Sequence, residues 1–143
     1  MGGRGSFAAG KPVPPTYRTV GTIHGVKVLE GINGKHSLPE SSNTSLAYIK
    51  LKPDGTFHEI RFYDKNHILF LEVAYHPESN LGSPLKPILH YHLYDPKFSK
   101  TQIKQRDLRS NALKLPGGMK KKLRKYFKGV QFWLTAILKI LLK

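Results

Sequence analysis

The sequence contains no cysteine and few acidic residues among its 143 positions. The absence of cysteine excludes a disulfide framework, a thiolate nucleophile and any zinc site with cysteine ligands. Nine Asp and Glu residues stand against 24 Lys and Arg residues, so the formal net charge is +15. Such an excess of positive charge favours polyanionic partners, with nucleic acid first and an anionic membrane second.

Long apolar segments are also scarce. The longest candidate, residues 130–142, is interrupted by Gln131 and Lys139, and it is shorter than the roughly 20 residues that a membrane-spanning helix needs. The first residues, MGGRGSFAAGKPVPP, lack the apolar stretch of a secretory signal. We therefore expect neither a transmembrane helix nor a cleaved signal peptide.

The composition divides the chain into four parts. Residues 1–16 are rich in glycine and proline and are expected to form a flexible N-terminus. Residues 17–110 are expected to form a β-rich domain, and residues 111–118 carry a Pro-Gly-Gly breaker that indicates a linker. Residues 119–143 have the spacing of a basic amphipathic helix. The predicted fold class is α+β, an antiparallel β-meander of about five strands with a C-terminal amphipathic helix.

Alternating apolar and polar residues between turn signals indicate the strands of this domain. A hairpin is expected over residues 17–31, with its turn near His24 and Gly25. The later strands are expected at residues 45–52, 56–64, 67–76 and 88–95. Residues 77–87 contain three prolines and are expected to form a loop, while residues 100–115 suggest a short helix.

Because side chains alternate across a strand, each strand assigns its residues to two faces of the sheet. An apolar face can be assembled from every expected strand. The opposite face is then expected to collect titratable side chains, which are Glu59, Arg61, Tyr63, Glu72, His90 and His92, with Lys50 from the first of the later strands and His76 at the rim.

The pair His90 and His92, one residue apart on an expected strand, permits three interpretations. The two side chains can simply mark the solvated face of an antiparallel sheet. They can also bind a transition metal such as zinc or iron, with Glu72 or His76 as a third ligand, although the spacing fixes no third ligand. In the third interpretation they transfer protons in a catalytic site.

The catalytic interpretation requires no metal ion. Cleavage of RNA by its own 2′-hydroxyl needs a base for the hydroxyl proton, an acid for the leaving 5′-oxygen and cationic groups for the phosphate. His90 and His92 could transfer the protons, Arg61 and Lys50 could bind phosphate oxygens, and Glu72 could orient an imidazole. This arrangement fits a metal-independent ribonuclease, for which we expect neither a metal nor another cofactor.

Short motifs occur in a fixed order between residues 39 and 95. They are Pro39-Glu40-Ser41-Ser42-Asn43-Thr44-Ser45, Asp54-Gly55, Arg61-Phe62-Tyr63-Asp64, Tyr75-His76 and His90-Tyr91-His92. In this order they resemble small domains at the ends of bacterial polymorphic toxins and in prophage-encoded proteins. Such domains are similar to the BECR nucleases, the superfamily of barnase, EndoU, colicin and RelE type.

This resemblance implies a metal-independent ribonuclease fold that acts in the bacterial cytoplasm. It also implies RNA as the substrate, such as tRNA or another structured RNA, and an immunity protein or a phage structural protein as a partner. Three positions depart from the pattern: His67 replaces a turn glycine, Leu93 replaces a tryptophan and Leu89 replaces a proline.

The last part of the chain combines an apolar stripe with eight Lys and Arg residues and no acid. The basic residues of its first half are expected to bind RNA phosphates, and they are Lys120, Lys121, Lys122, Arg124 and Lys125. Residues 119–143 could cover the apolar face of the sheet, bind an anionic membrane surface at the membrane periphery, or dock onto another protein.

The leading hypothesis is therefore a BECR-type phage or toxin ribonuclease. One alternative is a non-enzymatic phage or host interaction protein that binds a polyanionic or protein partner through the same basic surface. Another is a membrane-active effector that acts through residues 119–143.

Overall fold

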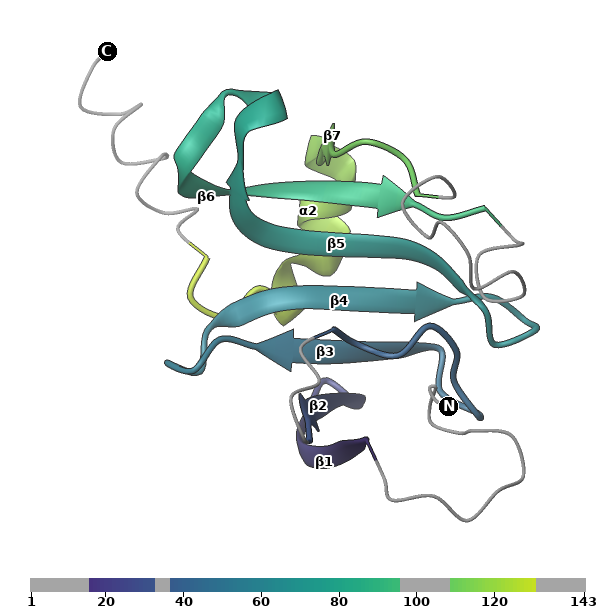
Figure 1. Cartoon of the computed structure of the whole chain (residues 1–143). Coiled ribbons are helices and arrows are strands. Elements are labelled where there is room, and N and C mark those ends of the chain that lie inside the picture. Colours follow the sequence, from purple (N-terminus) through teal and green to yellow (C-terminus); the bar gives the residue numbers. More distant parts are fainter. Residues whose placement is uncertain (1–15, 33–36, 96–108, 131–143) are drawn as a thin grey trace.

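The computed structural model describes residues 16–32, 37–95 and 109–130. Within these ranges the strands form one seven-stranded sheet whose order follows the sequence (Figure 1). The strands are β1 (Tyr17–Ile23), β2 (Val26–Gly31), β3 (Ala47–Leu51), β4 (Phe57–Tyr63), β5 (Leu69–Glu78), β6 (Ser83–Leu93) and β7 (Leu113–Lys114). The helical elements are the 3₁₀ turn η1 (Ser79–Leu81), the helix α2 (Gly117–Leu123) and the 3₁₀ turn η3 (Arg124–Tyr126).

The mostly antiparallel sheet confirms the α+β class but not a meander of about five strands. Strands β2 and β3 are parallel, because the connection between them crosses the sheet instead of making a tight turn. The short strand β7 was not expected, and in it Leu113 and Lys114 pair with Tyr91 and His90 of β6.

The expected hairpin at the start of the domain is confirmed. His24 and Gly25 have φ angles of 47° and 82° at the turn between β1 and β2. Two successive residues with positive φ are typical of the two-residue turn whose twist matches paired strands. In the turn after β3, the Asp54 carboxylate accepts hydrogen bonds from the Thr56 backbone (2.9 Å) and hydroxyl (2.6 Å), the side-chain-to-backbone bond that is typical of aspartate in turns.

Two segments that the sequence suggested as connections are built into the sheet. In place of a loop at residues 77–87, β5 extends to Glu78 and β6 begins at Ser83. The prolines there are tolerated because pairing is irregular between His76 and Glu78.

In residues 111–118, expected to be a linker, Ala112 and Leu115 are buried. A short helix was expected over residues 100–115. Residues 100–108 lie outside the described ranges, and the described residues 109–115 contain no helix, since β7 occupies 113–114.

The apolar face of the sheet forms the main hydrophobic core. Its fully buried side chains include Ile49, Phe57, Ile60 and Val73. The residues of the C-terminal part that pack against this core are Met119 and Leu123 of α2, Tyr126, Phe127 and Val130. Full burial of a side chain such as Phe127 contributes about 1.5–3 kcal/mol, and the partly buried side chains contribute less. The interpretation that this part of the chain covers the apolar face is therefore confirmed for its described residues, 119–130.

The predicted long helix over 119–143 is corrected by the structure. Helix α2 ends at Leu123, and the backbone leaves helical geometry at Phe127 (φ −89°, ψ 58°). It leaves there because the Phe127 ring packs on Phe57, with ring centres 4.9 Å apart, and the Lys128 carbonyl accepts a 2.7 Å hydrogen bond from the Phe57 backbone. Residues 131–143 lie outside the described ranges.

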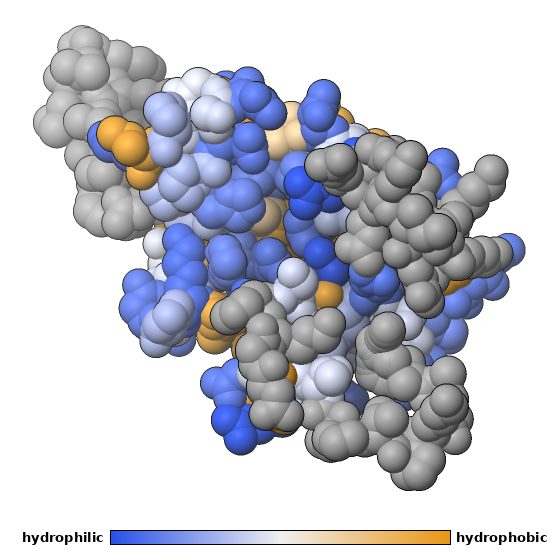
Figure 2. All heavy atoms as spheres, in the orientation of Figure 1, coloured by the Kyte–Doolittle hydropathy of each residue, from blue (hydrophilic) through white to orange (hydrophobic). Residues whose placement is uncertain are grey.

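In the part of the chain that the structure describes, no helix is long and apolar enough to cross a membrane. The face of the sheet away from α2 is largely hydrophilic (Figure 2). It carries the candidate functional site.

Candidate functional site

Strand pairing places the predicted polar residues on one face of the sheet. Arg61 of β4 is opposite Glu72 of β5, which is opposite His92 of β6. Directly opposed residues of antiparallel strands lie on the same face, so these three side chains share the face away from α2. Glu59 and His90 both lie opposite Ala74 and join them there. The prediction of a shared polar face is confirmed.

Arg61 and Glu72 form a buried ion pair in this face. The Arg61 Nε lies 2.6 Å from Glu72 Oε2, and the two side chains are only 9% and 5% exposed. Burial alone would lower the pKa of Arg61, but the charges of Glu72 and Glu59 raise it overall. Burial would likewise raise the pKa of Glu72, but Arg61 lowers it through its charge and hydrogen bond. Both groups are therefore charged.

The connection between β2 and β3 covers this ion pair. The carbonyl of Leu38 accepts a 2.6 Å hydrogen bond from Arg61 Nη1, and that of Pro39 accepts one of 2.6 Å from the Tyr63 hydroxyl. Ser42 donates a 2.6 Å hydrogen bond to the Ser45 carbonyl. The serine-containing motif of the resemblance thus has a structural role here, because it holds the connection across the polar face.

Glu59 is a second buried carboxyl on the polar face, 8% exposed. Burial raises its pKa, and the nearby Glu72 carboxylate raises it further. Its Oε1 has no hydrogen-bond partner among the described residues. The pKa of Glu59 is therefore shifted up, whereas that of its neighbour Glu72 is shifted down.

His90 and His92 are also buried, with 0% and 3% exposure. His90 Nδ1 lies 2.8 Å from the Ile88 carbonyl and His92 Nδ1 lies 2.9 Å from the Ser110 carbonyl. Because a carbonyl can only accept, each Nδ1 carries the hydrogen. Burial lowers the pKa of both imidazoles. They are therefore neutral at pH 7.

Within the described residues four imidazoles form a row across β4, β5 and β6. Neighbouring ring centres are 5.9 Å apart between His58 and His76, 4.4 Å between His76 and His90, and 5.3 Å between His90 and His92. We call these four residues the imidazole row. Each contact is edge-to-face, an arrangement that aromatic rings prefer.

His58 is the member of the imidazole row that sequence reasoning missed. Strict alternation would place it on the apolar face with Ile60. A bulge shifts the register between β3 and β4, so that Lys50 is opposite Glu59 while Leu51 is opposite Phe57. The extra residue turns His58 to the polar side. The sequence did contain a signal of this bulge. The apolar residues Phe57 and Ile60 are three positions apart, which departs from the two-residue period of a regular strand.

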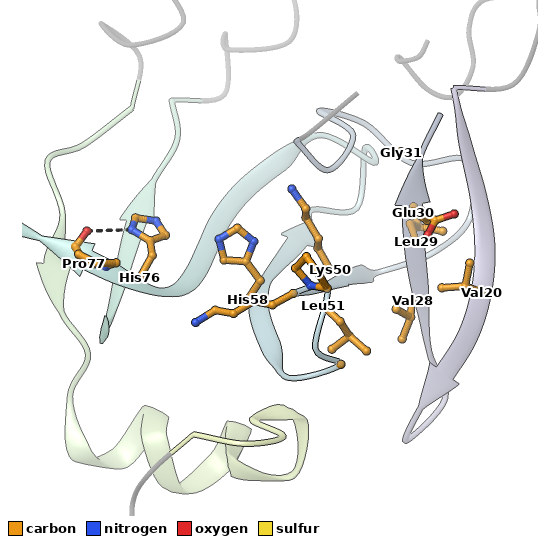
Figure 3. A pocket seen from close by; sticks show the side chains of 13 residues that line it. Val20, Val28, Leu29, Glu30, Gly31, Lys50, Leu51, His58, His76 and Pro77 are labelled. Atoms are coloured by element: carbon orange, nitrogen blue, oxygen red, sulfur yellow. Dashed lines mark hydrogen bonds between the residues drawn. The ribbon is translucent and has the colours of Figure 1, made fainter. Parts of the chain in front are cut away.

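A groove of about 770 Å³ opens beside the imidazole row (Figure 3). Lys50, Lys52, His58 and His76 line it together with residues of β2 that include Glu30. Burial, and then the charge of Lys50, lower the pKa of His58 to about 4. The groove therefore presents lysine side chains beside a neutral imidazole.

The predicted phosphate-binding residues are divided between two faces of the sheet. Lys50 lines the groove. The others belong to α2 and η3, which pack on the opposite, apolar face, and they are Lys120, Lys121, Lys122, Arg124 and Lys125. One short nucleic-acid segment in the groove cannot contact both groups at once.

The structure therefore brings together the predicted residues His90, His92, Arg61, Glu72 and Lys50, and it adds His58 and Lys52. Comparison with protein-family models, curated proteins and solved structures found no match to this chain.

Proposed function

We propose that the protein is a ribonuclease of the metal-independent type that binds an RNA strand in the groove. The observation that supports this proposal best is the pairing of two imidazoles with two lysines. His58 and His76 have ring centres 5.9 Å apart, and Lys50 and Lys52 line the same groove. Two proton-transfer groups beside cationic groups are what cleavage by a 2′-hydroxyl requires.

In this proposal the 2′-hydroxyl of the bound RNA attacks the adjacent phosphorus. A bond forms between the 2′-oxygen and phosphorus, and the bond from phosphorus to the 5′-oxygen breaks. His58 takes the proton from the 2′-hydroxyl, and His76 gives a proton to the leaving 5′-oxygen. Lys50 and Lys52 bind the phosphate oxygens while negative charge builds up on them. The products are a 2′,3′-cyclic phosphate and a free 5′-hydroxyl.

The four predicted catalytic residues support this pair from inside the sheet. His90 packs edge-to-face on His76, with ring centres 4.4 Å apart. Arg61 and Glu72 form the buried ion pair beside His92. We assign proton transfer to His58 and His76 because they line the groove, whereas His90 and His92 are at most 3% exposed.

A second candidate function is polyanion binding without turnover. The engagement of Arg61 favours it, because this guanidinium already donates to Glu72 and to the Leu38 carbonyl, each at 2.6 Å. Under this alternative the groove lysines would hold RNA, or an acidic surface of an immunity or phage structural protein. Either function would be exercised in the bacterial cytoplasm.

Membrane binding through the C-terminal part has weaker support. Met119, Leu123 and Phe127, the start of the apolar stripe, pack against the core of the protein itself. These side chains therefore already contact the protein's own core, where a membrane would have to replace that contact.

The experiment that tests the proposal uses a fluorescent RNA oligonucleotide in buffer with EDTA at low salt. We expect cleavage that leaves a 2′,3′-cyclic phosphate, and no cleavage of the matching DNA. His58→Ala should reduce the rate by about 10² or more, whereas His24→Asn, at an exposed histidine in the β1–β2 turn, should not. RNA binding without cleavage would favour the second candidate. Cleavage that occurs without EDTA and is lost when EDTA is added would refute the metal-independent mechanism.

A further inference from the structure

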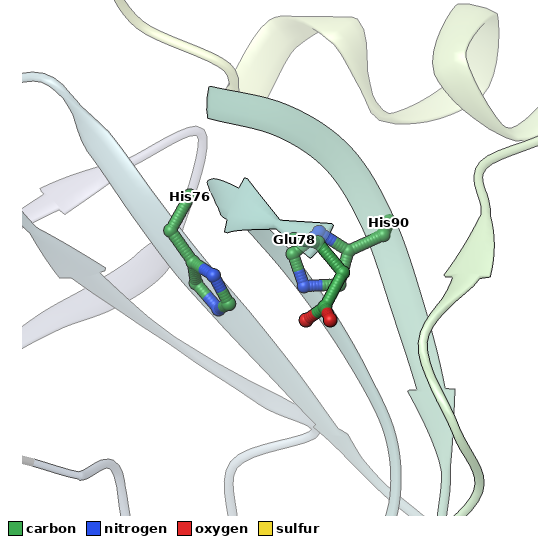
Figure 4. Close-up of side chains that lie close together, drawn as sticks. All are labelled: His76, Glu78 and His90. Atoms are coloured by element: carbon green, nitrogen blue, oxygen red, sulfur yellow. The ribbon is translucent and has the colours of Figure 1, made fainter. Parts of the chain in front are cut away.

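We propose that His76, Glu78 and His90 form a binding site for a divalent transition metal ion of the zinc class. Their ligand atoms all lie within 4.8 Å of one another. Figure 4 shows the Glu78 carboxylate beside the His90 ring, with the His76 ring facing the same space. This proposal does not depend on the proposed ribonuclease function.

Two neighbouring strands build the site. His76 and Glu78 are alternate residues near the end of β5, and His90 comes from β6. His90 is paired with Ala74, two residues before His76, so the two rings meet across the strands at 4.4 Å. The irregular pairing between His76 and Glu78 bends β5 at this point and brings the carboxylate toward the imidazoles.

Hydrogen bonds fix which nitrogen of each imidazole is available. His76 Nδ1 lies 3.0 Å from the Pro77 carbonyl, and His90 Nδ1 lies 2.8 Å from the Ile88 carbonyl. Both Nδ1 atoms must donate to these carbonyls, which leaves each Nε2 with its lone pair. Metal-binding histidines usually have this arrangement, in which one ring nitrogen binds the ion and the other donates to a carbonyl or carboxylate.

The most specific observation concerns His90 Nε2. The atom is buried in a residue with 0% exposure, and it has no hydrogen-bond partner among the described residues. A buried polar atom without a partner is rare in folded proteins, because its desolvation is not compensated. A metal ion bound to His76 and Glu78 would supply the missing partner for this lone pair.

The donor set indicates the class of metal. Two imidazole nitrogens and one carboxylate suit zinc and neighbouring transition metals, whereas magnesium and calcium prefer oxygen ligands alone. Ligand atoms around a tetrahedral zinc ion are roughly 3.3 Å apart. Since the three groups lie within 4.8 Å, small side-chain rotations, chiefly of the half-exposed Glu78, would close the site around the ion. A fourth position remains for water.

The site shares His76 with the groove. An ion bound to His76 Nε2 would occupy the lone pair that must take up a proton before His76 can pass one to a leaving group in the groove. If the proposed ribonuclease activity is present, zinc is therefore expected to inhibit it and EDTA to restore it.

Metal binding by the full chain, freed of metal with EDTA and then dialysed, tests the site directly. Calorimetric titration with zinc chloride should show one high-affinity equivalent, and cobalt chloride should give the visible absorption of a tetrahedral Co²⁺ site. His76→Ala and Glu78→Gln should each weaken zinc binding by about tenfold or more. The His24→Asn control should bind as the wild type does.

The variants change half-buried side chains, and circular dichroism would show whether they keep the wild-type fold. Absence of zinc binding by the wild type would overturn the proposal. Equal binding by wild type and both site variants would also overturn it, because the ion would then sit elsewhere. Neither measurement uses RNA, so a failure of the proposed ribonuclease function would leave these results unaffected.

Discussion

The Arg61 guanidinium and the Glu72 carboxylate lie 2.6 Å apart in the interior of the polar face, where each side chain is less than one-tenth exposed. The Leu38 carbonyl, in the crossing connection, accepts a further hydrogen bond from the guanidinium. The pair thus joins β4, β5 and the β2–β3 connection. It lies next to His92, at one end of the imidazole row.

Removing one partner of this ion pair should be costly. Glu72→Gln leaves the buried Arg61 charge without its ion-pair partner and is expected to destabilise the protein by about 3–5 kcal/mol. The double variant Arg61→Met with Glu72→Leu removes both charges, and its free energy of unfolding should fall much less than that of Glu72→Gln. Urea unfolding followed by circular dichroism measures both. A double variant as unstable as Glu72→Gln would show that the charge left unpaired is not the cause.

The raised pKa of Glu59 predicts an unusual dependence of stability on pH. The pKa of this buried carboxyl is raised, whereas an unfolded glutamate ionises near pH 4.3. Above that pH the unfolded chain binds fewer protons than the folded protein, so the contribution of Glu59 to stability falls as pH rises. Glu59→Gln should match the wild type near pH 4 and be more stable at pH 7. Thermal unfolding at both pH values checks this, and an equal pH dependence for both proteins would contradict it.

Two glycines with left-handed backbone offer a matched test of packing. Gly55 and Gly129 have φ angles of 87° and 79°, but a Cβ on Gly55 would meet nothing within 4 Å, whereas one on Gly129 would overlap the Thr56 side chain. Gly55→Ala should therefore cost about 1–2 kcal/mol from backbone strain alone. Gly129→Ala should lower the free energy of unfolding clearly more than Gly55→Ala does, and urea unfolding measures both. Equal losses would mean that the contact between residues 129 and 56 does not restrain the chain.

Much of the sheet could be predicted from sequence because its signals are local. The alternation of apolar and polar residues marked the strands, and His24-Gly25 marked a turn that requires positive φ. The same alternation correctly placed Arg61 and His92 on one face. These features depend on neighbours along the chain, which the sequence displays directly.

The features that sequence reasoning missed depend on contacts between distant segments. The bulge that turns His58 to the polar face arises from how β4 pairs with β3. The parallel pairing of β2 and β3 depends on the path of the connection that Leu38 anchors to Arg61. The helix ends early because Phe127 packs on Phe57. In each case tertiary contacts override a local pattern, so the pattern alone could not show the outcome.

The division of basic residues between two faces predicts which lysines bind nucleic acid. Lys50 and Lys52 line the groove, while Lys120 and Lys121 belong to α2 on the opposite face. The variant Lys50→Gln with Lys52→Gln should weaken the binding of single-stranded RNA and lower the slope of log K against log salt by about 1.4. The matched variant Lys120→Gln with Lys121→Gln removes the same charge and should change the slope less. Fluorescence anisotropy over a series of salt concentrations measures both, and a larger effect of the helix variant would place the RNA on α2 rather than in the groove.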